Sequence, residues 1–211
     1  MSAPRIPRTA TVILSALIAL MWVLVVLLGV DDRAAVLLGF IPARLSGLVD
    51  ISPAVPAILT PLSATLVHGG LFHLGFNLLI FVWCGAMVER ALGTRSLLSL
   101  FVVGAYASAM AQWAVDPTSV VPMIGASGAI SAVIGAYALS FGTQKQLVKS
   151  RSLNRALNAL WLLAAWVVLQ LMTAFMAGEQ GMLLATPAHI GGFIAGLLMQ
   201  RPLLMWRYRQ A

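Results

Sequence analysis

The chain has 211 residues, of which 61% are hydrophobic and 9% are charged. A soluble domain is about 45–50% apolar, so this composition excludes an ordinary soluble protein and predicts an all-α polytopic membrane protein built as one membrane domain. The formal net charge of +7 comes from basic residues scattered in short flanks between apolar runs, so we expect no nucleic-acid partner.

A transmembrane helix needs about 20 apolar residues, and six segments of the chain meet or approach that length. The first follows Arg5 and Arg8 and runs into Asp31 without a cleavage site, so we expect a retained helix rather than a signal peptide. The fourth is the shortest, so we expect it to begin below the outer membrane surface, beside a cavity. The predicted spans are 9–30, 71–87, 97–115, 127–141, 157–177 and 188–204.

The connection 31–70 between the first two spans is apolar and broken by prolines, so we expect it to lie on or partly in the outer membrane interface. Basic residues collect on the other side of the membrane. Of all the lysines and arginines, only Arg33 and Arg44 fall outside. The positive-inside rule therefore predicts that both termini are cytoplasmic.

Polar side chains gather at the same end of three predicted spans. His73 and Asn77 share one face near the start of the second span. Ser127 begins the fourth span and His189 begins the sixth. Because these three spans all run from outside to inside, we expect the four side chains at similar depth, towards the outer leaflet. Such groups are costly in hydrocarbon and indicate a functional site.

Small residues recur at helical spacing below Ser127 and below His189, and such stripes let transmembrane backbones approach closely. Pairing the two stripes from their upper ends predicts that Ser127 lies beside His189. The stripes are Ser127, Ser131 and Gly135 in the fourth span, and His189, Gly192 and Gly196 in the sixth.

A serine hydroxyl needs a neighbouring base to become a nucleophile. An imidazole titrates near neutral pH, so His189 can take the proton of Ser127 and return it to a leaving amine. No acidic residue lies in a span near either residue. We therefore expect a Ser–His dyad rather than a triad, with no metal and no cofactor.

Attack on an amide carbonyl creates an oxyanion, which needs preorganised donors. The backbone N–H of Ser127 is free at a helix N-terminus, and the side chains of His73 and Asn77 can add further donors. We expect Gly125 and Gly128 to keep the backbone open to a substrate strand. Bulk at Gly128 should then obstruct substrate more than it disturbs folding.

These motifs resemble those of the rhomboid intramembrane serine proteases. The segment 125–128, Gly-Ala-Ser-Gly, is similar to the family's Gly-x-Ser-Gly and implies that Ser127 is the nucleophile. His189, followed by Gly192 and Gly196, resembles the catalytic histidine with its glycine stripe. The family often has an aromatic residue four positions after the nucleophile, against which the histidine packs. Ser131 stands there in this chain, and we expect it to supply a hydrogen bond instead.

The second predicted span adds to the resemblance. The segment 68–77 is similar to a family pattern in which the residues matching His73 and Asn77 serve the oxyanion, and His68 matches an outer histidine associated with structure and water near the site. Glu89 and Arg90 resemble the charged inner end of that helix, which implies a structural role.

The resemblance implies a rhomboid-like six-helix fold in a bacterial plasma membrane. It also implies an endopeptidase whose substrates are transmembrane segments of other proteins in the lipid bilayer. The fifth span, 157–177, carries none of the proposed catalytic groups, so it is our candidate for the element that moves to admit substrate. Two alternatives stay open: a catalytically silent rhomboid-like protein that binds membrane clients, and a small transporter. The oligomeric state is left open.

Overall fold

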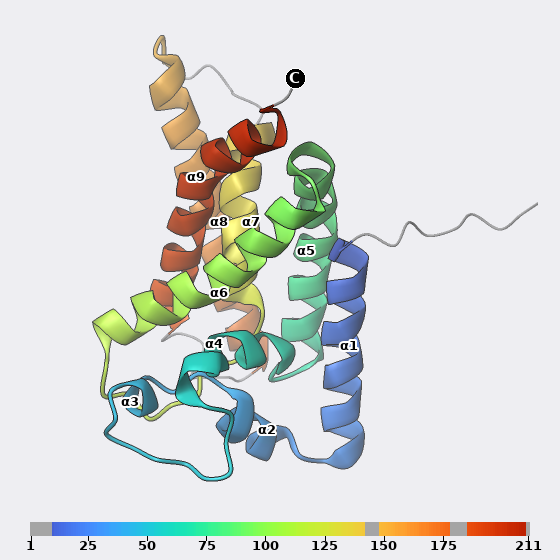
Figure 1. Cartoon of the computed structure of the whole chain (residues 1–211), viewed down its shortest axis with the longest axis vertical. Helices are drawn as coiled ribbons and strands as arrows, with labels where there is room; N and C mark the ends of the chain where they lie inside the picture. The colour runs from blue at the N-terminus through green and yellow to red at the C-terminus, as the bar shows by residue number, and fades with distance from the viewer. Residues whose placement is uncertain (1–9, 142–147, 178–184, 210–211) are drawn as a thin grey trace, which may run out of the picture.

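The computed structural model describes residues 10–141, 148–177 and 185–209. Within these residues the fold is all-α, as predicted, and six long helices correspond to the six predicted spans (Figure 1). Their bounds are α1 Ala10–Leu28, α5 Leu71–Leu92, α6 Thr94–Val115, α7 Ser127–Phe141, α8 Arg151–Ala177 and α9 Thr186–Arg207.

Several helices extend beyond the apolar segments that predicted them. α5 continues to Leu92, and α8 begins at Arg151 rather than near residue 157. An apolar stretch marks only the part of a helix that suits hydrocarbon, whereas helical hydrogen bonding continues through polar residues. By length and composition, the described residues contain four helices suited to crossing a membrane, namely α1, α5, α6 and the Arg151–Leu169 part of α8. Several residues used in the span and charge predictions lie outside the described residues, namely Thr9, the basic residues Arg5, Arg8 and Lys145 assigned to the inner side, and the acidic residue Glu179 assigned to the outer side.

α7 forms the centre of the molecule, and it packs chiefly against α9 and α6, with α5 and α8 on its other sides. Every residue from Ser127 to Ala136 is buried. Small residues make this possible because they let neighbouring backbones come close. A Cβ at Gly135 would overlap the Phe193 carbonyl, and one at Gly196 would overlap the Ala132 carbonyl. The two predicted small-residue stripes therefore do face each other.

Residues 31–70 fold into a layer of short helices across one end of the bundle, which we call the outer layer (Figure 1). Phe40 of this layer is buried, and its backbone pairs with that of Met123 in the segment that leads into α7. The outer layer is thus built into the fold, while its place in the membrane interface stays a prediction. Its helices are α2 Asp31–Leu38, α3 Pro42–Leu45, η1 Ala57–Leu59, α4 Thr60–Ser63 and η2 Ala64–Leu66.

One carboxylate joins three helices near the opposite end. Glu89 of α5 accepts hydrogen bonds from the Ala10 and Thr11 amides at 2.8 and 3.0 Å. It also accepts bonds from the hydroxyls of Thr11 and Thr94, at 2.6 and 2.9 Å. The first amides of a helix have no partner within the helix and carry its positive dipole end. Glu89 therefore holds the start of α1 against α5 and the start of α6.

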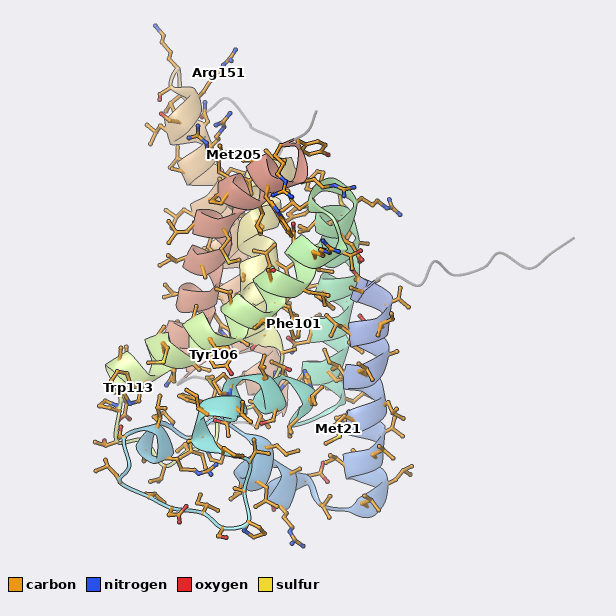
Figure 2. The ribbon with its side chains drawn as sticks, in the orientation of Figure 1. Met21, Phe101, Tyr106, Trp113, Arg151 and Met205 are labelled. Carbon is orange, nitrogen blue, oxygen red and sulfur yellow. The ribbon has the colours of Figure 1, made fainter. Side chains whose placement is uncertain are left out.

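The two ends of the bundle carry different side chains. Figure 2 shows Arg151 and Met205 at the end where α8 begins and α9 finishes, and Trp113 at the outer end of α6. The indole of Trp113 donates to the Ser46 hydroxyl at 2.9 Å, which ties α6 to the outer layer. At the other end, the Tyr208 hydroxyl donates to the Ala91 carbonyl at 3.2 Å, so the end of α9 lies over the end of α5.

Candidate active site

The side chains of Ser127 and His189 meet at the first turns of α7 and α9. His189 Nε2 lies 2.8 Å from Ser127 Oγ, which is hydrogen-bonding distance. Both residues are buried, with 7% of Ser127 and 2% of His189 exposed. Among the described residues, the hydrogen bonds of His189 include none to a carboxylate. The structure thus brings together the two side chains that the paired small-residue stripes predicted to be neighbours.

Gly125 allows His73 to approach this pair. Its φ of +109° lies in the region that favours glycine. A Cβ at this position would stand 2.7 Å from His73 Nε2 and 3.8 Å from Ser127 Oγ. His73 and Ser127 therefore flank the same short piece of backbone, and a side chain at Gly125 would displace the imidazole. This places the expected oxyanion donor on the side of Ser127 where Gly125 leaves room.

Asn77 is fully buried one helical turn below His73. Its Nδ2 donates to the His73 carbonyl at 2.8 Å. In this structure Asn77 thus braces the turn that carries His73, and an oxyanion role would use the second N–H of its amide. Its position on the inward face of α5 agrees with the predicted sharing of a face by the two residues.

His68 supports the loop that leads into α7. The Ala126 amide donates to His68 Nε2 at 3.3 Å, and the ring of His68 lies edge-on to that of His73 with 5.0 Å between centroids. Burial, assisted by the nearby His73, lowers the pKa of His68 to about 3. The ring is therefore neutral at physiological pH, as an acceptor of the Ala126 N–H must be.

Ser131 does not bond to His189, so the expected replacement for the aromatic residue was wrong. Its hydroxyl donates to the Ser127 carbonyl at 2.7 Å, the bond that a serine makes readily to the preceding helical turn. The same oxygen accepts the indole N–H of Trp166 at 2.7 Å. Trp166 also packs edge-on against His189, with 6.3 Å between ring centroids and an interplanar angle of 68°. The aromatic partner of the imidazole thus comes from α8.

Gly128 packs against α6 and α9, which the sequence analysis did not foresee. A Cβ there would overlap the Ser108 hydroxyl of α6, and the Gly128 carbonyl lies where a Cβ at Gly192 would be. The expectation that bulk at Gly128 affects substrate more than folding stays a prediction. Because Ser108 occupies the space beside Gly128, we now expect bulk there to lower stability as well. Gly192 and Gly196 lie in the α7–α9 contact, as expected.

Two cavities border the site. A small one of about 20 Å³ is lined by residues that include Ser127, His189 and Ser108. A larger one of about 350 Å³ lies under the outer layer and reaches His68, His73 and Gln112. Gln112 is 8% exposed, and its Oε1 has no hydrogen-bond partner.

Three residues of this site were absent from the sequence prediction, namely Ser108, Gln112 and Trp166. Ser108 and Gln112 share a face of α6, since they are four residues apart. Two polar side chains on one face, near the outer end of the predicted span 97–115, could have indicated from the sequence that this face of α6 borders the site.

The family model described as Rhomboid domain matches residues 57–206 of the chain. The chain belongs to the rhomboid family. The matched region contains every residue of the site described above. The chain is also similar to proteins named Rhomboid protease GlpG from three bacteria. The identity is 35% over 140 residues for Pectobacterium atrosepticum, 32% over 139 residues for Serratia proteamaculans and 33% over 140 residues for Yersinia pestis. Each alignment covers 65% of this rhomboid chain and 45% of the relative, so the chain matches about half the length of these curated relatives.

Proposed function

We propose that this rhomboid-family chain is an intramembrane serine endopeptidase with a Ser127–His189 dyad. The 2.8 Å contact between Ser127 Oγ and His189 Nε2 carries the proposal. The contact is buried among helices suited to a membrane, where placing polar side chains costs free energy and therefore indicates a function. The names of the similar proteins support the same activity.

The reaction follows from the positions of these groups. Ser127 Oγ attacks the carbonyl carbon of the scissile bond while its proton passes to His189 Nε2. The resulting oxyanion is stabilised by the Ser127 amide together with His73 and Asn77. When the C–N bond breaks, the leaving amine takes the proton from His189. Water then attacks the acyl-enzyme and His189 accepts its proton. This proton returns to Ser127 Oγ as the acyl–oxygen bond breaks, and the released carboxylic acid loses its proton to water.

The substrates in this proposal are transmembrane segments of other membrane proteins, cut towards the outer side of the bilayer. The larger cavity lies under the outer layer, next to His68 and His73, which supports access of water to the site from that side. A peptide bond within a helix has to unwind before a nucleophile reaches its carbonyl carbon. We place the protein in a bacterial plasma membrane on the basis of its similarity to bacterial rhomboid proteases. Its charge distribution supports the placement of both termini in the cytoplasm.

The test compares the purified wild-type protein with Ser127→Ala and His189→Ala on a single-span substrate in proteoliposomes. We expect each change to lower cleavage by at least about a thousandfold, since a dyad loses its function with either member. Ser99→Ala is the matched control and should cleave normally, because Ser99 is a half-buried serine on α6 whose hydroxyl donates to the Arg95 carbonyl of the preceding turn. Cleavage that survives both changes would contradict the mechanism.

A wild-type protein that captures a client without cutting it, and whose Ser127 does not react with a fluorophosphonate, would favour the silent client-binding alternative.

A further inference from the structure

Trp166 differs from the other tryptophan of its helix. It is 4% exposed, whereas Trp161, which lies on the same helix α8, is 71% exposed. Most of the other described side chains of α8 are at least partly exposed. A buried indole carries an N–H that has to find an acceptor. Trp166 is thus the point at which α8 inserts a large side chain into the core beside α7.

Two contacts connect Trp166 to the two members of the dyad. Its ring lies edge-on to the imidazole of His189, with 6.3 Å between centroids. Its N–H donates to Ser131 Oγ at 2.7 Å, and the Ser131 hydroxyl donates to the Ser127 carbonyl at 2.7 Å. A single side chain of α8 therefore contacts the imidazole directly and reaches the serine through one hydroxyl.

The direction of this hydrogen-bond chain is fixed. An indole N–H only donates, so the Ser131 oxygen has to accept from Trp166. The one hydrogen of Ser131 is then given to the Ser127 carbonyl, and the buried hydroxyl is satisfied on both sides. The ring packed against His189 limits rotation of the imidazole about its side-chain bonds. A small displacement of either group lowers the reaction rate strongly, since about 1 Å of misplacement can reduce a rate by about a hundredfold.

We propose that Trp166 is a positioning residue that holds both Ser127 and His189 in the attacking geometry, which makes the rate of the chemical step depend on α8 lying against α7. The inference rests on the proposed protease function for its kinetic consequence. Its structural consequence, an imidazole held by the indole ring, is measurable without any activity. Trp166 supplies from α8 the aromatic ring beside His189, whereas position 131 of α7 holds a serine.

Kinetics on a transmembrane substrate provide the first test. We expect Trp166→Leu, which removes both contacts, to lower kcat by about a hundredfold with KM within twofold of wild type. Trp166→Phe keeps a ring beside His189 but removes the N–H, and should lower kcat by about fivefold. Trp161→Leu is the matched control on the same helix and should leave kcat unchanged. A loss confined to KM, or a kcat of Trp166→Leu equal to that of Trp161→Leu, would overturn the proposal.

The histidine signals provide the second test, which does not depend on cleavage. The chain has three histidines, so a ring-labelled sample gives three NMR signals, and His189→Gln identifies the one from His189. We expect Trp166→Leu to move the His189 signal and leave the other two in place, since the ring current of the indole is removed. An unmoved His189 signal in a folded variant would overturn the proposal, even if the wild type cuts no substrate. If Trp166→Leu does not fold, Trp166→Phe and Ser131→Ala are used, and both should change kcat and not KM.

Discussion

Gly125 lies two residues before Ser127 and Gly128 lies one residue after it, and the two glycines are needed for different reasons. At Gly125 the backbone itself has a positive φ and passes directly under the His73 imidazole. At Gly128 the backbone is an ordinary helix, and the absence of a side chain lets α6 bring Ser108 close. One glycine therefore shapes the site, and the other sets the distance between helices.

The packing of Gly128 gives the first prediction. Gly128→Val forces two methyl groups against Ser108, and overpacking of this kind costs about 2 kcal/mol or more. We therefore expect Gly128→Val to lower Tm as well as activity, measured by thermal unfolding in detergent. Gly75→Val on α5 is the matched control, because nothing lies within 4 Å of a Cβ at that position. A Gly128→Val protein with wild-type Tm and no cleavage would support the original expectation that this glycine serves substrate entry.

Single residues differ in how far the sequence predicts them. Ser127 and His189 were predictable because polar side chains are rare in apolar spans and because their depth follows from topology. Trp166 was not predictable, because Trp161 and Trp166 both lie in one apolar run and an aromatic side chain is equally suited to lipid and to a core. Only the packing of α8 on α7 distinguishes them.

At the scale of helices, α8 combines two properties. It was our candidate for the moving element because it carried no proposed catalytic group, and that reason does not hold now that Trp166 reaches the site. Most of its described side chains are nevertheless exposed, and its contacts with the core are fewer than those of α9. If α8 moves to admit substrate, the indole leaves Ser131 and His189, and the dyad is positioned again only when the helix returns.

The carboxylate of Glu89 gives the second prediction. Glu89→Ala removes four hydrogen bonds that join α1, α5 and α6, which we expect to lower the free energy of unfolding by about 3 kcal/mol. Glu89→Gln keeps one acceptor oxygen and should lower it by about half as much. Thermal unfolding measures both, and Asp50→Ala, an exposed carboxylate of the outer layer, is the control. Equal Tm values for Glu89→Ala and Asp50→Ala would show that the carboxylate does not hold the start of α1.

The outer layer was the least predictable element. Its apolar residues indicated a position on or partly in the outer membrane interface, but prolines recur between residues 42 and 61, and no helix was assigned in this segment. The structure shows that short helices begin at such prolines, as Pro42 does for α3. Burial there depends on contacts with distant segments, such as Phe40 with Met123, which no local pattern contains.

At the scale of the whole molecule, the proposed orientation in the membrane rests on the distribution of charge, to which Arg44 is an exception. Its Nη2 donates to the Val55 carbonyl at 2.9 Å within the outer layer. This basic residue of the outer layer therefore contributes to folding, whereas Arg151 lies at the opposite end of the bundle, as Figure 2 shows.

The third prediction tests this orientation. The only native cysteine, Cys84, is 6% exposed, so the wild type gives a low background with a membrane-impermeant maleimide. We expect Leu48→Cys in the outer layer to be labelled in spheroplasts, in which the outer membrane is opened and the plasma membrane is intact. Arg209→Cys should be labelled only after the plasma membrane is permeabilised. The reverse pattern would overturn the proposed topology and leave the geometry of the dyad untouched.

The small cavity beside Ser127 has a consequence for how often the protein cuts. Its volume of about 20 Å³ is enough for one water molecule, which needs about 10–15 Å³, and far too small for a stretch of polypeptide. The cavity beside Ser127 thus has room for water but not for polypeptide. Under the proposed protease function, each cut has to begin with a rearrangement, and part of the binding free energy of a substrate goes into that rearrangement rather than into affinity. In that proposal, selectivity among membrane proteins is decided during this rearrangement, before any bond is broken.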